Sequence, residues 1–171
     1  MGSDTLSLAL GFLLNFLATL GGVFVAFLLT FWYDKRRKSS EAREIQKRII
    51  STLQTEIERN FDDVKANKSQ VGPSSVIVAI FRDSAYQSAV NSGNLSLLKE
   101  DVRNALANIY LNFQFVETLA AKAFSMLGTI TADEWGKYGT RVDQMFSDRL
   151  DVLLRDIPGT LELLKREKRQ S

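Results

Sequence analysis

Apolar residues form one unbroken run at the start of the chain. From Leu6 to Tyr33 there are 28 residues and no charged side chain. An α-helix rises ~1.5 Å per residue, so roughly 20 residues cross the hydrocarbon of a bilayer with every backbone hydrogen bond satisfied inside the helix. A cleaved signal peptide is the alternative, but its apolar region spans only about 7–15 residues and needs a basic start that residues 1–4 lack. The run therefore predicts a transmembrane helix over 6–33.

The residues that follow this run predict its orientation. Trp32 and Tyr33 carry amphipathic rings suited to the membrane interface. Four basic residues that resist translocation come next: Lys35, Arg36, Arg37 and Lys38. We therefore expect a short extracytoplasmic tail over 1–5, a cytoplasmic C-terminal part, and contact between these four side chains and the membrane surface.

Small and polar residues recur every four positions within the run and so share one helical face. The two series are Ser7, Gly11, Asn15 and Thr19, and Ala18, Gly22, Ala26 and Thr30. In lipid, such stripes let helices approach closely, and a mid-span Asn gains a hydrogen-bonding partner across the interface. We expect this stripe to pack the spans of a homo-oligomer. Two alternatives are that Gly and Ala are simply common in membrane helices, and that Asn15 faces water inside an oligomeric pore.

Helical periodicity continues beyond the apolar run. Residues 34–70 contain neither Pro nor Gly. Within them Ile50, Leu53, Ile57 and Val64 fall at the three- and four-residue spacing of an apolar helical face. The pattern predicts that the span continues as a basic juxtamembrane helix over 34–70, whose 49–66 stretch packs on the rest of the protein.

A break and a turn divide the middle of the chain. Gly72 and Pro73 end the long helix, and Ser75 can cap the next one. Residues 76–81 have strand propensity, but no second strand exists to pair with them, so we interpret them as helical. The sequence Ser92-Gly93-Asn94 then predicts a turn.

Two long amphipathic helices complete the chain. The apolar face of the first comprises Leu98, Val102, Ala105, Ile109, Phe113, Val116, Ala120, Ala123 and Leu127. Gly128 ends it, and Thr131 with Glu134 forms a capping box for the second. The buried face of the second comprises Trp135, Tyr138, Val142, Met145, Phe146, Leu150, Leu153 and Ile157. We expect Pro158-Gly159 to stop this helix and a short terminal one to follow.

These elements predict an all-α fold, with one N-terminal transmembrane helix that continues into a cytoplasmic helical bundle over 75–171. Charge is polarised along it: residues 34–48 carry a net charge of +4, whereas residues 49–164 carry −4. Basic groups beside a cytoplasmic leaflet attract anionic lipid by ~1 kcal/mol each. Nucleic acid is not expected as a partner, because no aromatic interleaving, zinc knuckle or helix-turn-helix signature accompanies the basic residues.

Composition removes most catalytic chemistry. The chain has no His and no Cys, which excludes imidazole acid–base chemistry, thiol nucleophiles and Cys/His metal sites. Ser96 and Lys99 match the S-x-x-K spacing of penicillin-binding enzymes, but the supporting S-D-N and K-T-G elements are missing. Acidic pairs such as Asp62-Asp63 lack any metal-binding spacing. We therefore expect no enzyme activity, no cofactor and no metal site.

The chain resembles a loose group of uncharacterised prokaryotic single-pass membrane proteins with a cytoplasmic helical domain. The resemblance rests on the Gly-containing stretch 20–27, the aromatic-basic exit 32–37, the helix segment 53–60, and residues 85–98 leading to Ile109-Tyr110. It covers roughly the first two thirds of the chain. It implies this architecture and a prokaryotic inner-membrane setting, and it implies no reaction.

Two functional hypotheses follow. The first is a non-enzymatic, homo-oligomeric membrane protein that acts as a scaffold or as a pore. The second is a membrane-tethered sensor or binding module, such as a defence-associated effector, that recognises an unidentified cytoplasmic protein or small-molecule ligand. The analogy to small membrane proteins that accompany antiviral systems is one of architecture alone.

Overall fold

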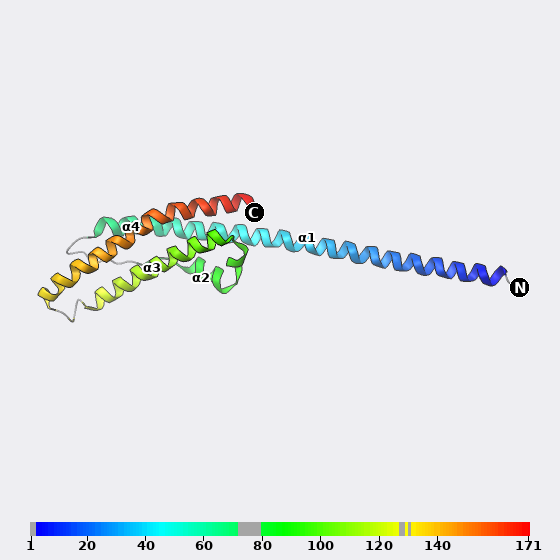
Figure 1. Ribbon diagram of the computed structural model, residues 1–171, viewed down its shortest axis with the longest axis horizontal. Coiled ribbons are helices and arrows are strands. Elements are labelled where there is room, and N and C mark those ends of the chain that lie inside the picture. Colours follow the sequence, from blue (N-terminus) through cyan, green and yellow to red (C-terminus); the bar gives the residue numbers. More distant parts are fainter. Residues whose placement is uncertain (1–2, 72–79, 127–128, 130) are drawn as a thin grey trace. The chain divides into compact units, whose positions relative to one another are not determined.

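The protein is helical throughout the residues that the structure describes. This computed structural model describes the backbone of residues 3–71, 80–126, 129 and 131–171, and for residues 3–16, 18, 132–135 and 137 it describes no side chain. The elements are the helices α1 (Ser3–Gln70), α2 (Ser84–Asn91), α3 (Glu100–Met126) and α4 (Ala132–Gln170), with a 3₁₀ helix η1 (Asn94–Leu97) (Figure 1). The predicted all-α class is confirmed for this part of the chain.

The chain divides into two compact units, residues 1–43 and 44–171. The first unit is the N-terminal part of α1, in which every described side chain from Leu17 to Glu41 is exposed. Within the described residues, no helix contains a stretch that is both long and apolar enough to cross a membrane. The transmembrane helix expected over 6–33 stays a prediction, and the side chains of its residues 6–16 and 18 lie outside the described part.

The second unit is a helical bundle built from the C-terminal part of α1, α3 and α4. Gln46 of α1 bonds to Glu167 near the end of α4, whereas Lys68 of α1 reaches Asp151 in the middle of α4. These pairs show that α1 and α4 are antiparallel. Figure 1 shows that α4 is antiparallel to α3 as well, so α1 and α3 run parallel.

Parallel neighbours require the chain to travel back along the bundle between them. Residues 80–99 do this beside α1: Arg82 bonds to Asn60, and Ala85 bonds to Glu56. Gly93 adopts a φ of 70°, the left-handed region that residues with a Cβ disfavour, in the turn predicted there. The turn leads into η1, which the sequence did not predict.

The helix predicted to include residues 76–81 is corrected in part. Residues 75–79 lie outside the described part, but Ile80 and Phe81 are not helical, and α2 begins only at Ser84. The physical reason is that side chains of neighbouring helices take the place of helical hydrogen bonds. The N–H of Phe81 donates to Glu117 at 2.7 Å, and the N–H of Arg82 donates to Asn60 at 2.9 Å.

The bundle core follows the predicted apolar faces closely. Four residues of α1 are fully buried, as predicted: Ile50, Leu53, Ile57 and Val64. The buried residues of α3 include Val102, Leu106, Ile109, Tyr110, Phe113 and Val116, of which Leu106 and Tyr110 were not predicted. On α4 the predicted Val142, Phe146, Leu150, Leu153 and Ile157 are buried. Met145 is 39% exposed instead, and the side chain of Trp135 lies outside the described part.

The expectation that Pro158 ends a helix is wrong. α4 continues through Pro158 and Gly159 to Gln170. Proline lacks the N–H that would bond to the carbonyl four residues earlier, which destabilises a helix interior by ~3 kcal/mol. Continuing the helix keeps Leu161 and Leu164 buried on the same stripe as Ile157, and each buried leucine contributes roughly 1.5–3 kcal/mol. The burial of these two leucines therefore outweighs the helix-breaking effect of Pro158.

Candidate functional site

The predicted packing stripe is described in part. The side chains of Ser7, Gly11, Asn15 and Ala18 lie outside the described residues. The hydroxyl of Thr30 donates to the carbonyl of Ala26 at 2.9 Å, and a Cβ placed on Gly22 would meet open space beyond the helix's own backbone and the adjacent residues. Beside Gly21, which also has open space, lies an apolar hollow of about 560 Å³ lined by Leu17, Leu20, Gly21, Val23, Phe24 and Phe27.

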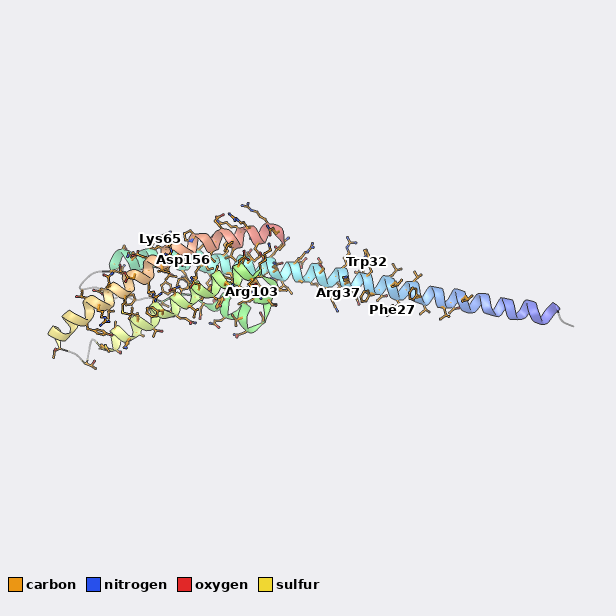
Figure 2. All side chains as sticks on the ribbon, in the orientation of Figure 1. Phe27, Trp32, Arg37, Lys65, Arg103 and Asp156 are labelled. Atoms are coloured by element: carbon orange, nitrogen blue, oxygen red, sulfur yellow. The ribbon has the colours of Figure 1, made fainter. Side chains whose placement is uncertain are left out.

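The four predicted basic residues fall on different sides of the helix. The guanidinium carbon of Arg36 lies 5.2 Å from the centroid of the Trp32 ring. Arg37 points elsewhere and pairs with Glu41 at 2.8 Å, and this hydrogen-bonded carboxylate raises the pKa of Arg37. Figure 2 labels Trp32 and Arg37 along this part of α1. The four residues therefore do not form one patch.

A second basic grouping emerges around Trp32. A hollow of about 470 Å³ on the surface of α1 is lined by Trp32, Lys35, Arg36, Ser39, Ser40 and Arg43. Ser39, Ser40 and Arg43 were not among the residues predicted to contact the membrane surface. The spacing of three and four residues from Trp32 could have found them, since it places all six residues on one helical face.

In the bundle, one buried carboxylate joins three helices. Glu56 of α1 is only 6% exposed. It accepts hydrogen bonds from the phenol of Tyr110 at 2.6 Å, from the N–H of Ala85 at 2.7 Å and from the N–H of Tyr86 at 3.3 Å. The two amides belong to the first turn of α2, where helix N–H groups have no partner within the helix. Glu56 therefore acts as the cap of α2, although it lies on another helix.

The environment of Tyr110 is strongly apolar apart from this bond. The Tyr86 ring stacks on it with centroids 4.1 Å apart, and Phe113 meets it edge-on at 5.6 Å. Burial, reinforced by the hydrogen bond to Glu56, raises the pKa of Tyr110 well above its ordinary value. The phenol therefore stays protonated as a donor, which suits a structural bond.

A second buried carboxylate fastens the end of α4. Glu167 is 4% exposed and accepts from the side-chain amide of Gln46 at 2.9 Å and from the N–H of Lys99 at 3.2 Å. The Lys99 ammonium lies 3.7 Å from the same carboxylate and also bonds to Gln170. Ser96, the other half of the S-x-x-K match, donates to the carbonyl of Gly93 at 2.7 Å. Ser96 and Lys99 thus bond to different partners and do not face each other.

An open groove between α3 and α4 is a candidate ligand site in the described part of the bundle. It encloses about 570 Å³ and is lined by Asn108, Leu111, Asn112, Phe115, Arg149, Val152, Arg155 and Asp156. Arg149 donates to Asn112 at 3.3 Å and lies 4.6 Å from the centroid of the Phe115 ring. Arg155 pairs with Asp156 at 2.8 Å, which raises the pKa of Arg155. A guanidinium on an aromatic face with amides beside it can bind a small anionic ligand.

The remaining candidate chemistry is accounted for by local contacts. Asp62 and Asp63, adjacent in sequence, pair separately with Lys65 at 3.1 Å and with Arg82 at 2.8 Å. Among the described residues, no three carboxylates are grouped in a way that could hold a metal ion.

Comparison with known proteins adds no relative. No protein-family model, no curated protein and no solved structure matches the chain.

Proposed function

We propose that the chain is a non-enzymatic, single-pass membrane protein that forms a homo-oligomeric scaffold or pore through its N-terminal helix. The observation that carries the proposal is a helix that exposes large apolar side chains all round. These are Leu17, Leu20, Val23, Phe24, Val25, Phe27, Leu28, Leu29, Phe31, Trp32 and Tyr33. Apolar surface in water costs roughly 25 cal/mol per Å², so this helix needs lipid or other helices around it.

Lipid is favoured over a water-soluble coiled coil. A coiled coil buries only one stripe of each helix and presents charged residues on the others. Residues 6–33 carry no charge at any position, so this helix lacks the charged faces that a soluble coiled coil presents to water. The basic residues that begin at Lys35 support an N-terminus outside and a cytoplasmic bundle. The inner membrane of a prokaryotic cell is the setting that the resemblance implies.

Membrane insertion is tested on the full chain expressed in bacteria. We expect the protein to stay in the membrane pellet after an alkaline carbonate wash. Added protease should cleave the bundle only in inverted vesicles, which expose the cytoplasmic side. Recovery of the intact chain in the washed supernatant would contradict the proposal.

Assembly is tested by the mass of the detergent-solubilised particle. We expect a multiple of the 19.2 kDa chain. Gly22→Leu should reduce the mass of the particle, because a larger side chain separates packed helices. Val23→Leu, one position off the stripe, is the matched control and should leave the mass unchanged. Ion flux into liposomes then separates pore from scaffold: a pore lined by Asn15 should lose conductance in Asn15→Leu.

The groove between α3 and α4 supports a second candidate function, that of a membrane-tethered binding module. Thermal unfolding of the full chain with inorganic phosphate or with citrate tests this. A ligand held by Arg149 should raise the Tm of the wild type but not that of Arg149→Gln. Lys122→Gln, on the exposed surface of α3, removes the same charge and is the control. Equal shifts in all three proteins would point to a general salt effect and against a site.

A further inference from the structure

We propose that one face of α1 binds the phosphate headgroup of an anionic phospholipid. This headgroup face consists of Trp32, Lys35, Arg36, Ser39, Ser40 and Arg43, the residues that line the hollow of about 470 Å³. The inference rests on the proposed membrane anchoring and adds a lipid class and a binding surface to it.

The geometry gathers these six side chains on one side of the helix. An α-helix turns about 100° per residue, so steps of three and four residues return to the same face. The positions 32, 35, 36, 39, 40 and 43 are such steps, and they span about three turns. Arg36 already lies against the Trp32 ring at 5.2 Å, which holds its guanidinium beside the hollow.

The charge on this face is uncompensated. At about 100° per residue, Asp34 and Glu41 fall on the opposite side of the helix. Glu41 is engaged there by Arg37 at 2.8 Å. The residues that line the hollow include three cations, Lys35, Arg36 and Arg43, and no carboxylate.

These groups match a phosphodiester. A guanidinium presents paired N–H donors that suit two phosphate oxygens, and an ammonium adds a point charge. The hydroxyls of Ser39 and Ser40 can donate further hydrogen bonds. A phosphodiester in this position would meet three cations and two hydroxyls within three turns of one helix.

The neighbouring residues select a lipid over free phosphate. Leu28 and Leu29 precede Trp32 by four and three residues, so the same side of the helix is apolar immediately before the headgroup face, and both leucines are exposed. Trp32 stands at the boundary, where indole rings favour the membrane interface. The ligand that fits both parts has an acyl chain beside Leu28 and Leu29 and an anionic headgroup beside Lys35, Arg36 and Arg43.

Quenching of Trp32 fluorescence by brominated lipid tests this. The chain has two Trp residues, so Trp135→Phe in the full chain leaves Trp32 as the one indole fluorophore. The protein is reconstituted in phosphatidylcholine vesicles that contain a small fixed fraction of brominated phosphatidylglycerol or, for comparison, brominated phosphatidylcholine. We expect stronger quenching by the brominated anionic lipid.

Two double variants with the same net charge distinguish the effect of the headgroup face from the effect of total charge. Lys35→Gln/Arg36→Gln should lower the preference for phosphatidylglycerol about thirtyfold, because the two basic residues together contribute ~2 kcal/mol. Arg37→Gln/Lys38→Gln removes two charges outside the headgroup face and should retain most of the preference. An equal loss of the preference for phosphatidylglycerol in both variants would show that the preference depends on total charge, and would overturn the proposed site.

The remaining outcomes are also decisive. If the two brominated lipids quench Trp32 equally in the protein whose headgroup face is unsubstituted, the inference is overturned and membrane anchoring is left intact. Loss of the preference on adding inorganic phosphate, with total ionic strength held constant, assigns the site to free phosphate instead. A chain that does not sediment with the vesicles overturns the proposed function and this inference with it.

Discussion

The carboxylate of Glu56 on α1 accepts a 2.6 Å hydrogen bond from the phenol of Tyr110 on α3, and both side chains are buried. The same carboxylate receives two amides from the first turn of α2. A negative group is favoured at a helix N-terminus by the helix dipole and by the unpaired N–H groups. One side chain therefore sets the position of α2 against both long helices.

Glu56→Ala should destabilise the bundle by about 2–4 kcal/mol, since it removes a helix cap and leaves a buried phenol without an acceptor. Glu56→Gln keeps an acceptor and should cost about half as much. Hydrogen exchange measured by mass spectrometry should show faster exchange of residues 84–91. Glu58→Ala, an exposed neighbour, is the control, and an effect as large there would contradict the capping role.

Stability should fall at alkaline pH because of Tyr110. Its pKa is raised in the folded state, so its contribution is fully present below the unfolded value of about 10 and is lost as the pH rises above that value. The free energy of unfolding should decrease by roughly 1.4 kcal/mol per pH unit in this window. Tyr110→Phe should flatten this dependence. In a spectroscopic titration, one of the four tyrosines should ionise only on unfolding.

Pro158→Ala should stabilise the protein by about 1–3 kcal/mol, because it restores a backbone donor inside a continuous helix. Gly159→Ala should add about 0.5–1 kcal/mol, since Gly159 is helical and a Cβ there meets open space. Chemical denaturation of the detergent-solubilised chain measures both. If the helix ended at Pro158, Gly159→Ala would be neutral or destabilising.

Glu167→Ala should cost about 1–3 kcal/mol, because the part-buried backbone amide of Lys99 and the Gln46 side chain lose their acceptor. Glu162→Ala is the matched control on the same helix. Glu162 is exposed, and its hydrogen bond to Lys165 lowers its pKa, but exposed pairs contribute little to stability. Comparable losses in the two variants, measured by thermal unfolding, would contradict a special role for Glu167.

Periodicity was a reliable guide wherever burial decides the structure. The stripe of Ile50, Leu53, Ile57 and Val64 was readable because each residue is fully enclosed. Pro158 predicts a helix end that does not occur, because a helix-breaking residue carries no information on the apolar contacts that a continued helix gains. Phe81 lies outside a helix because its N–H donates to Glu117, a residue far away in the sequence, and periodicity carries no signal for such a bond.

The polar connections were harder to read. Glu56 was missed because a lone Glu in an amphipathic helix normally faces solvent. The available signal was its position: it lies three residues after Leu53 and four before Asn60, on the side that the core residues occupy. For the headgroup face, a run of adjacent basic residues drew attention to Arg37 and Lys38, whereas spacing from Trp32 identifies Arg43.

In the described part of the connection between α1 and α3, several main-chain atoms bond to side chains of the two long helices. Glu56, Asn60 and Glu117 bond to backbone groups of residues 81, 82, 85 and 86. Peptide groups are the same whichever amino acid carries them, so part of the information that places this segment resides in the three side chains that bond to it. Over evolutionary time positions 56, 60 and 117 should tolerate fewer replacements than the residues whose backbone groups they bond. Exchanging the connecting segment between diverged sequences should succeed only where these three side chains are kept.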